Sequence, residues 1–343
     1  MPQAPAVETP AVETKVFTDI AYEAQGKQVG VLRVPNSNNL SGWGTVSVPV
    51  AVVANGTGPT ALISAGVHGD EFEGQITLTK LVRSLAPEAI RGRVIILPAL
   101  HFPACMAGTR MSPIDGRDIN RCFPGDPYGS FAQVLAHYVA EVILPRVDFL
   151  FDIHSGGRGL NVTPSTCAHH SDDPAMMDKL TALAHACGAP FHMFLHSVDE
   201  TRTLPSAAER RGILAISSEF GGAGIVQLEA LQVAERAAHN FLVHAGILQA
   251  DPIPAPKPTR LVETPDLAAF TFAPHAGIFE PYHALAATVA QGAPAGAIHA
   301  IDAPDRAPTL VHYGASGPLW CTRGAGRVEP GDPVAIVASD WRA

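Results

Sequence analysis

The 343-residue sequence predicts an α/β fold, a sheet with helices on its faces, followed by a smaller β-domain. Two observations lead to this prediction. Between about residues 45 and 250, short runs rich in apolar and β-branched residues alternate with longer stretches of helical pattern, as in sheets covered by helices. A proline-rich segment at 251–262 then ends the pattern, and short strands punctuated by Gly and Pro follow it.

The elements of the main domain can be placed by their patterns. TVSVPVAVVA, at 45–54, alternates in part and is predicted to be a strand of an N-terminal β segment. The strands predicted after it are 60–66, 93–100, 148–156, 190–195 and 212–220. The predicted helices are Glu73–Leu85, Phe131–Leu144, Pro174–Cys187, Leu204–Arg211 and Val226–Ala245. Ligands of such sheets gather beyond the carboxyl ends of the strands.

Composition divides the chain into four regions. Residues 1–16 contain two copies of PAVET, with no basic start and no continuous apolar core, so we expect a flexible tail rather than a secretory signal. The main domain is expected at 17–250, a stiff linker at 251–262 and a β-domain at 263–343. A carrier domain with a swinging arm needs a lysine for the attachment of that arm. Residues 258–343 contain no lysine, so this role is excluded for the β-domain. We expect it to be structural or to cover the active site.

Charge and cysteine content exclude several classes of protein. The formal net charge is -9, and the 23 Lys and Arg residues are scattered, which argues against nucleic acid as a partner. No apolar run approaches the roughly 20 residues of a membrane span. Five cysteines without CxxC spacing argue against a disulfide framework and a cysteine zinc site. We therefore expect a cytoplasmic protein acting on a small molecule, and a homo-oligomer stays an open alternative.

Two glycine-flanked strand ends carry residues that could bind a metal. In GVHGDE, His68 and Glu71 lie three residues apart where a predicted strand ends, and the glycines leave room for a tight bend. In FDIHSGG, His154 ends another apolar strand. Two histidines and one glutamate form an open three-ligand zinc set with a fourth position for water, which indicates a hydrolase. Cobalt and manganese remain open as the metal in the cell.

The other histidines considered are predicted to be ordinary hydrogen-bonded surface or core residues. They are His101, His137, His169, His185, His192, His239 and His244.

The motifs GVHGDE, DINRCFPG, DIHSGG and SSEFGG, in this order, resemble the succinylglutamate desuccinylase/aspartoacylase family of the zinc-carboxypeptidase superfamily. The resemblance covers about residues 45–250. It implies a mixed sheet flanked by helices, a smaller C-terminal β-domain, one zinc ion per chain and hydrolysis of small N-acyl amino acids. Within the family, GTRMSPIDGRDINRCFPG is most similar to the deacetylases of ectoine degradation, which act on N-acetyl-2,4-diaminobutyrate.

The resemblance also implies roles for residues outside the metal set. Glu219 of SSEFGG matches the catalytic glutamate, which takes a proton from water and passes it to the leaving amine. Asn120 and Arg121 match the pair that grips a substrate carboxylate, for which a guanidinium fork is suited. Asp118 matches a carboxylate that orients the imidazole of His68.

Three further residues are candidates. Arg110 resembles the arginine that polarises the scissile carbonyl and shares the oxyanion with zinc, and Arg117 is its competitor. Asp152 is an acidic neighbour that could orient His154. Asp115 is a candidate contact for an extra amine on the substrate, although an Asp-Gly turn is the stronger interpretation.

Three alternatives to this deacetylase remain. A different N-acyl amino acid deacylase, an aspartoacylase or desuccinylase, would use the same residues. A metallocarboxypeptidase would share the metal set but needs an open groove for peptides, against which the β-domain argues. A metal-binding relative without catalysis would normally have lost a ligand or the glutamate, and all four are present in this sequence.

Overall fold

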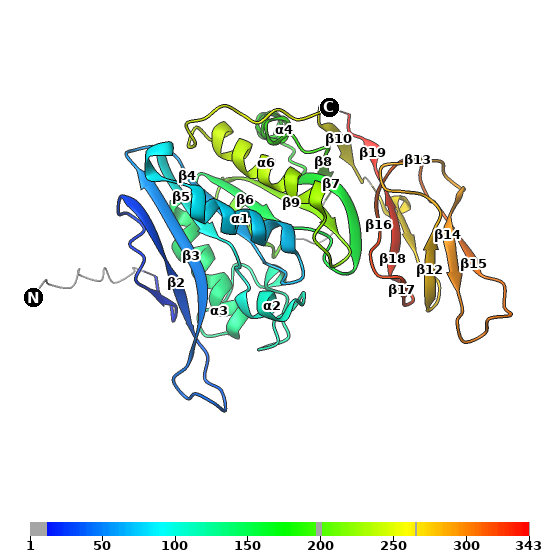
Figure 1. Cartoon of the computed structure of the whole chain (residues 1–343), viewed down its shortest axis with the longest axis horizontal. Coiled ribbons are helices and arrows are strands. Elements are labelled where there is room, and N and C mark those ends of the chain that lie inside the picture. Colours follow the sequence, from blue (N-terminus) through cyan, green and yellow to red (C-terminus); the bar gives the residue numbers. More distant parts are fainter. Residues whose placement is uncertain (1–11, 197–200, 265, 343) are drawn as a thin grey trace, which may run out of the picture.

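The structure, a computed structural model, describes residues 12–196, 201–264 and 266–342. Of the tail expected at 1–16, residues 1–11 therefore lie outside the described part of the chain. A large mixed sheet runs through the molecule, and a smaller four-stranded antiparallel sheet lies at one end (Figure 1). The predicted fold class, a mixed sheet flanked by helices with a smaller β region, is confirmed.

The strands of the large sheet are β1 (Phe17–Thr18), β2 (Gly26–Pro35), β3 (Thr45–Asn55), β4 (Thr60–Ala65), β5 (Gly92–Leu97), β6 (Phe149–Ile153), β7 (Leu160–His169), β8 (Phe191–Leu195), β9 (Leu214–Gly222), β10 (Arg260–Glu263), β11 (Phe270–Phe272), β13 (Thr288–Val289), β16 (Gly317–Arg323), β18 (Pro333–Val337) and β19 (Ser339–Asp340). The small sheet contains β12 (Gly277–Pro281), β14 (Pro294–His299), β15 (Thr309–His312) and β17 (Arg327–Val328). The α-helices are α1 (Phe72–Ser84), α2 (Phe102–Ala107), α3 (Phe131–Tyr138), α4 (Pro174–Cys187), α5 (Leu204–Glu209) and α6 (Leu228–His244).

Helices cover both faces of the central strands. In β4, Leu62 belongs to the apolar cluster that contains α3 and α5, whereas its neighbour Ile63 belongs to the cluster that contains α1, α4 and α6. This alternation follows from the two-residue period of a strand. It explains why β4 is buried along its whole length and reads as an apolar run, as strands covered on both faces do.

The order of the central strands determines where functional side chains can meet. β6 lies between β4 and β9, and both pairs are parallel. Carboxyl ends of adjacent parallel strands lie at the same edge of a sheet. The segments that follow β4 and β6, together with the last residues of β9, are therefore brought to one place.

The sheet continues beyond β9 through a strand that the sequence pattern did not predict. β7 pairs antiparallel with β9, and their register shifts between Val162 and Ser165. Pro164 lies at this bulge, where a strand tolerates the missing N–H. Proline within an apolar run argues against a strand in sequence analysis, which explains why β7 escaped prediction.

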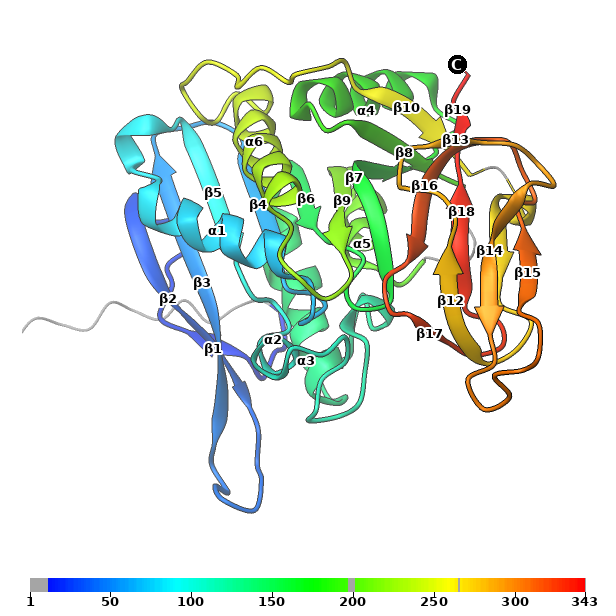
Figure 2. The same cartoon turned by 45° about the vertical axis from the view of Figure 1, so that its right-hand side comes forward.

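The C-terminal strands continue the large sheet. β16 pairs with β7, and β18 and β11 follow it, so that the C-terminal region lies directly beside the central strands (Figure 2). Of the linker expected at 251–262, residues 251–259 contain no helix or strand, and β10 pairs with β8 immediately afterwards. The division of the chain into domains at this linker stays a prediction.

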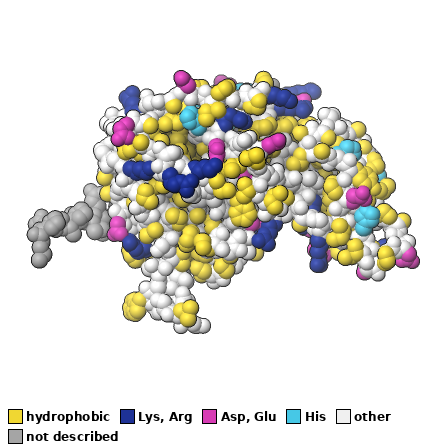
Figure 3. Space-filling model, in the orientation of Figure 1, with side chains coloured by type: hydrophobic (Ala, Val, Ile, Leu, Met, Phe, Trp, Pro, Cys, Tyr) yellow, Lys and Arg dark blue, Asp and Glu magenta, His cyan; other side chains and the backbone are white. Residues whose placement is uncertain are grey.

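The β2–β3 hairpin extends away from the body of the molecule (Figure 1). Hydrophobic side chains are visible at its tip in Figure 3, and Leu40 and Trp43 there are almost fully exposed. Among the residues that the structure describes, no helix combines the length and apolar character that crossing a membrane requires.

Most of the predicted helices and strands are present with shifts of one to three residues at their ends. α4 has the predicted bounds, because Asp173 caps its first turn and Gly188 ends it in the left-handed conformation. The helix expected over 131–144 is α-helical only to Tyr138 and continues as a short π-helix over Val139–Ile143.

Candidate active site

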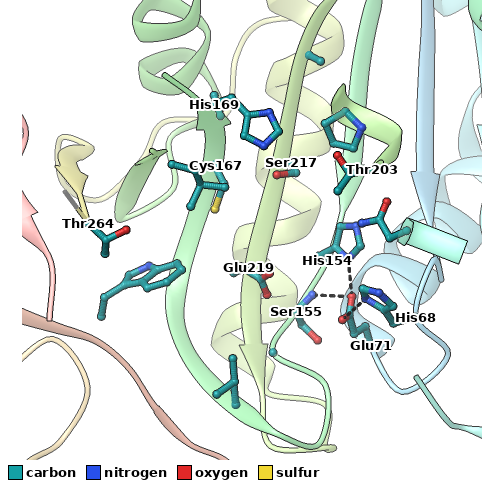
Figure 4. A pocket seen from close by; sticks show the side chains of 18 of the residues that line it. His68, Glu71, His154, Ser155, Cys167, His169, Thr203, Ser217, Glu219 and Thr264 are labelled. Carbon is teal, nitrogen blue, oxygen red and sulfur yellow. Dashed lines mark hydrogen bonds and ion pairs between the residues drawn. The ribbon is translucent and has the colours of Figure 1, made fainter. Parts of the chain in front are cut away.

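His68, Glu71 and His154 converge at the carboxyl edge of β4 and β6 (Figure 4). His68 lies in the turn after β4, Glu71 is the N-cap residue of α1, and His154 directly follows β6. Nδ1 of His68 lies 2.7 Å from one oxygen of Glu71, and Nδ1 of His154 lies 2.8 Å from the other. All three side chains are buried. The structure thus brings together the three residues proposed as metal ligands.

Both imidazoles are held from behind by aspartates. Nε2 of His68 lies 3.1 Å from Asp118, and Nε2 of His154 lies 2.9 Å from Asp152. The hydroxyl of Ser64 donates to the second oxygen of Asp152 at 2.7 Å. An Nε2–H donated to a carboxylate leaves Nδ1 as the free lone pair of a neutral imidazole. The lone pairs of the two Nδ1 atoms therefore face Glu71.

The chemistry of these groups indicates that a cation fits between the two imidazoles and Glu71. Two Nδ1 lone pairs and two carboxylate oxygens are all acceptors, and acceptors repel at 2.7–2.8 Å unless protons or a cation lie between them. Burial alone would lower the pKa of His154, but Asp152 and Glu71 outweigh it and raise that pKa well above its ordinary value. The cluster therefore attracts positive charge, and its imidazole and carboxylate donors suit zinc.

The loop that carries His68 and Glu71 is fixed by close backbone contacts. A Cβ on Gly69 would lie 2.0 Å from the carbonyl carbon and oxygen of Ala104, so only glycine permits this approach of the α2 region. The carboxylate of Asp70 accepts a hydrogen bond from the backbone N–H of Arg158 at 2.9 Å. This bond ties the His68 loop to the loop after His154.

Glu219, on β9, faces the same site, and its side chain is half-buried with the Oε2 atom shielded from solvent. Among the described residues, no group donates a hydrogen bond to its Oε2 atom. Burial and, to a smaller extent, the negative charge of Glu71 raise the pKa of Glu219 to about 7, against the opposing effects of the two histidines. A carboxyl group with such a pKa can both accept and donate a proton near neutral pH.

Arg110 lies beside the three proposed metal ligands, and Arg117 does not line the cavity. Nε and Nη2 of Arg110 donate to Asp118 at 3.1 and 2.8 Å, while its Nη1 lies 3.5 Å from Nδ1 of His68. Burial would raise the pKa of Asp118, but His68 and Arg110 hold it well below its ordinary value. Asp118 thus positions both His68 and Arg110, and the geometry favours Arg110 over Arg117 for a role at the carbonyl.

Asn120 and Arg121 line the same cavity from a short 3₁₀ turn, Ile119–Arg121. The side-chain oxygen of Asn120 accepts from the backbone N–H of Leu204 at 2.9 Å. Because that oxygen is used, the NH₂ group is the part of the amide that can donate to a ligand. The pair therefore offers N–H donors and one positive charge, as a carboxylate requires.

The structure does not bring Asp115 to the cavity. One of its oxygens accepts from the backbone N–H of Ala132 at 2.9 Å, in the first turn of α3, and the other accepts from the N–H of Arg117. These bonds satisfy backbone groups at a helix start and in a turn. Asp115 therefore has a local role here, in agreement with the turn interpretation, and its proposed contact with a substrate amine loses its support.

The cavity has a volume of about 270 Å³, a size suited to a small metabolite. Of the residues described above, those that line it are His68, Glu71, His154, Glu219, Arg110, Asn120 and Arg121. Several residues that no sequence motif marks as functional also line it: His169, Glu209, Thr264, Phe270 and Trp320. Trp320, on β16, donates to the hydroxyl of Ser165 at 2.8 Å. The C-terminal region thus supplies part of the wall, in line with a covering role.

A mixed α/β sheet that places two histidines and a glutamate in one small cavity, beside a second glutamate with an orphaned oxygen, has the donor set of hydrolytic zinc sites. Comparison with known proteins narrows this class. Residues 57–245, more than half of the chain, match the succinylglutamate desuccinylase/aspartoacylase catalytic domain. The chain belongs to this family.

Three relatives are similar over nearly the whole chain. N-alpha-acetyl-L-2,4-diaminobutyric acid deacetylase of Halomonas elongata is 38% identical over 323 residues, 94% of each protein. A succinylglutamate desuccinylase/aspartoacylase from Rhodobacter sphaeroides is 43% identical with a TM-score of 0.93, over 96% of this chain and 100% of that one. The product-bound ectoine utilization protein EutE of Ruegeria pomeroyi is 33% identical with a TM-score of 0.92, over 95% and 99% of the two chains.

Proposed function

We propose that this protein is a zinc-dependent deacetylase that hydrolyses N-α-acetyl-2,4-diaminobutyrate, a step of ectoine degradation. One observation carries the proposal. Nδ1 of His68, Nδ1 of His154 and both oxygens of Glu71 converge next to the partnerless oxygen of Glu219. The 38% identity to the Halomonas deacetylase and the likeness to EutE support this substrate over other N-acyl amino acids.

His68, Glu71 and His154 would hold the zinc ion. When bound, zinc lowers the pKa of a water molecule and polarises a carbonyl group as a Lewis acid. Glu219 would take the proton from the attacking water and return it to the leaving amine. Nη1 of Arg110, which Asp118 leaves free, would donate to the developing oxyanion.

The substrate would be held by its carboxylate. Arg121 and the NH₂ group of Asn120 would donate to it, which places the adjacent amide toward the metal ligands in the same cavity. Orientation of this kind supports a small N-acyl amino acid as substrate, because the free carboxylate lies next to the scissile amide.

A substrate panel tests the proposal. N-α-acetyl-2,4-diaminobutyrate, N-acetylaspartate, N-succinylglutamate and a blocked dipeptide would be compared by release of free amine from the zinc-loaded protein. We expect the highest kcat/KM for the first compound. Hydrolysis of only the dipeptide would instead identify a carboxypeptidase, and a clear preference for N-acetylaspartate or N-succinylglutamate would identify another deacylase of the family.

The substitution Arg121→Lys tests the carboxylate site. Lysine keeps the charge but loses the planar pair of donors, so KM should rise roughly 10- to 100-fold, the range of a lost hydrogen bond to a charged group. Zinc content should stay unchanged, because Arg121 does not touch the metal ligands. Arg327→Lys, at an exposed ion pair with Glu329, is the matched control. An unchanged KM in Arg121→Lys would place the carboxylate elsewhere.

A further inference from the structure

Glu209 is a carboxylate in the cavity that the proposed reaction does not use. It ends α5, and its side chain, 34% exposed, lines the cavity together with Thr203 and Pro205. Among the residues that the structure describes, the carboxylates lining this cavity are Glu71, Glu219 and Glu209. The first two face the metal site, so Glu209 is the one that is left for another group of the substrate.

A histidine holds this carboxylate in place. Nδ1 of His169, at the end of β7, lies 2.9 and 2.8 Å from the two oxygens of Glu209. A carboxylate has about four acceptor positions, so one N–H shared between its oxygens leaves room for further donors. Figure 4 places His169 and Thr203 at the end of the cavity away from His68 and Glu71. Glu209 thus offers negative charge at a distance from the scissile amide.

The charges of the cavity match a substrate with two opposite charges. Arg110 is neutralised by Asp118, whereas the guanidinium of Arg121 donates to the uncharged carbonyl oxygen of Asn120 and, within the described part of the chain, has no acidic partner. With His169 as a neutral N–H donor, Arg121 and Glu209 remain as one positive and one negative group. An N-α-acetyl amino acid that carries a side-chain ammonium presents the complementary pair, a carboxylate and a cation.

Both groups lie at α5. The side chain of Asn120, next to Arg121, binds the N–H of Leu204, the first residue of α5, and Glu209 is the last residue of this helix. A substrate between them would have its carboxylate at the start of α5 and its cation at the end of this helix.

We infer that Glu209, positioned by His169, binds the free ammonium of the substrate and selects N-acyl amino acids with a cationic side chain. This inference rests on the proposed function and adds a residue that determines specificity. Neutral side chains would leave Glu209 with His169 as its partner and no cation of the substrate, and acidic ones would place like charges together. Glu209, rather than Asp115, would then be the contact for the extra amine of the substrate.

The experiment compares Glu209→Gln with the unaltered protein on two substrates of the same shape. These are N-α-acetyl-2,4-diaminobutyrate and N-acetylnorvaline, in which a methyl group replaces the ammonium. We expect Glu209→Gln to lower kcat/KM for the first roughly 5- to 50-fold, mainly through KM, because the site is partly exposed. The value for N-acetylnorvaline should stay within about twofold. Glu209→Asp, which keeps the charge on a shorter side chain, should retain part of the preference.

Glu280→Gln is the matched control, since Glu280 also pairs with a histidine, His299 at 2.9 Å, but on the small sheet. It should change neither value. Equal losses on both substrates, or an unchanged preference in Glu209→Gln, would overturn the inference.

If the unaltered protein hydrolyses neither compound, the proposed function fails. The role of Glu209 is then tested separately, by calorimetric measurement of the affinity for free 2,4-diaminobutyrate and for norvaline. Weaker binding of only 2,4-diaminobutyrate to Glu209→Gln supports the inference, and equal binding to both proteins overturns it.

Discussion

Alanine in place of His154 is expected to remove most of the bound zinc, and with it nearly all turnover. The substitution leaves only two protein donors, whereas catalytic zinc sites use three. It also leaves Asp152 buried without its imidazole partner. Since the metal contributes several kcal/mol to the reaction, turnover should fall by roughly a thousandfold or more. Zinc per chain, measured by elemental analysis after dialysis, should drop well below one, and the same is expected for His68→Ala and Glu71→Ala.

The control for this experiment is His185→Ala, an exposed histidine on α4 far in sequence from the cluster. It should keep zinc and activity. Thermal unfolding of each variant, with and without added zinc, distinguishes a lost ligand from a misfolded chain: zinc should raise the Tm of the control but not of His154→Ala. A variant that retains one zinc per chain would remove that residue from the proposed ligand set.

The convergence of His68, Glu71 and His154 could be predicted from the sequence because its signals are local. His68 and Glu71 share one turn, His154 directly follows an apolar strand, and glycines flank both places. The physical reason for one of these glycines became clear only in the structure, where Gly69 lies against the carbonyl of Ala104, more than 30 residues later in the chain. The sequence pattern indicates that the chain can bend at Gly69. Only the fold shows that this bend brings Gly69 against the backbone of Ala104.

The rest of the cavity could not be predicted because it depends on pairing between distant strands. Trp320 reaches the cavity because β16 pairs with β7, and β7 itself contains Pro164, which hides it from pattern analysis. Glu209 follows no motif and simply ends a six-residue helix. Asp115 shows the reverse case, since it lies in a suggestive motif but binds backbone groups of a turn and of α3.

Glutamine in place of Glu219 is expected to abolish most turnover while zinc and fold are retained. The amide has nearly the shape of the carboxylate but cannot take a proton, and loss of a general base typically costs about 10²- to 10⁴-fold. The comparison is kcat of the zinc-loaded variant with that of Glu229→Gln, an exposed glutamate in the first turn of α6. If Glu219 were a metal ligand, the substitution would weaken zinc binding instead.

The pH profile gives an independent check of the same role. Burial raises the pKa of Glu219 to about 7, and a bound cation nearby would favour the charged form and lower this pKa. A general base works only when deprotonated, so kcat/KM of the unaltered protein should fall as pH decreases through the pKa of Glu219, in the range below about 7. The residual activity of Glu219→Gln should lack this acidic limb, because the amide does not titrate. Near-normal activity with full zinc, or an acidic limb that persists unchanged in the variant, would show that Glu219 is not the base.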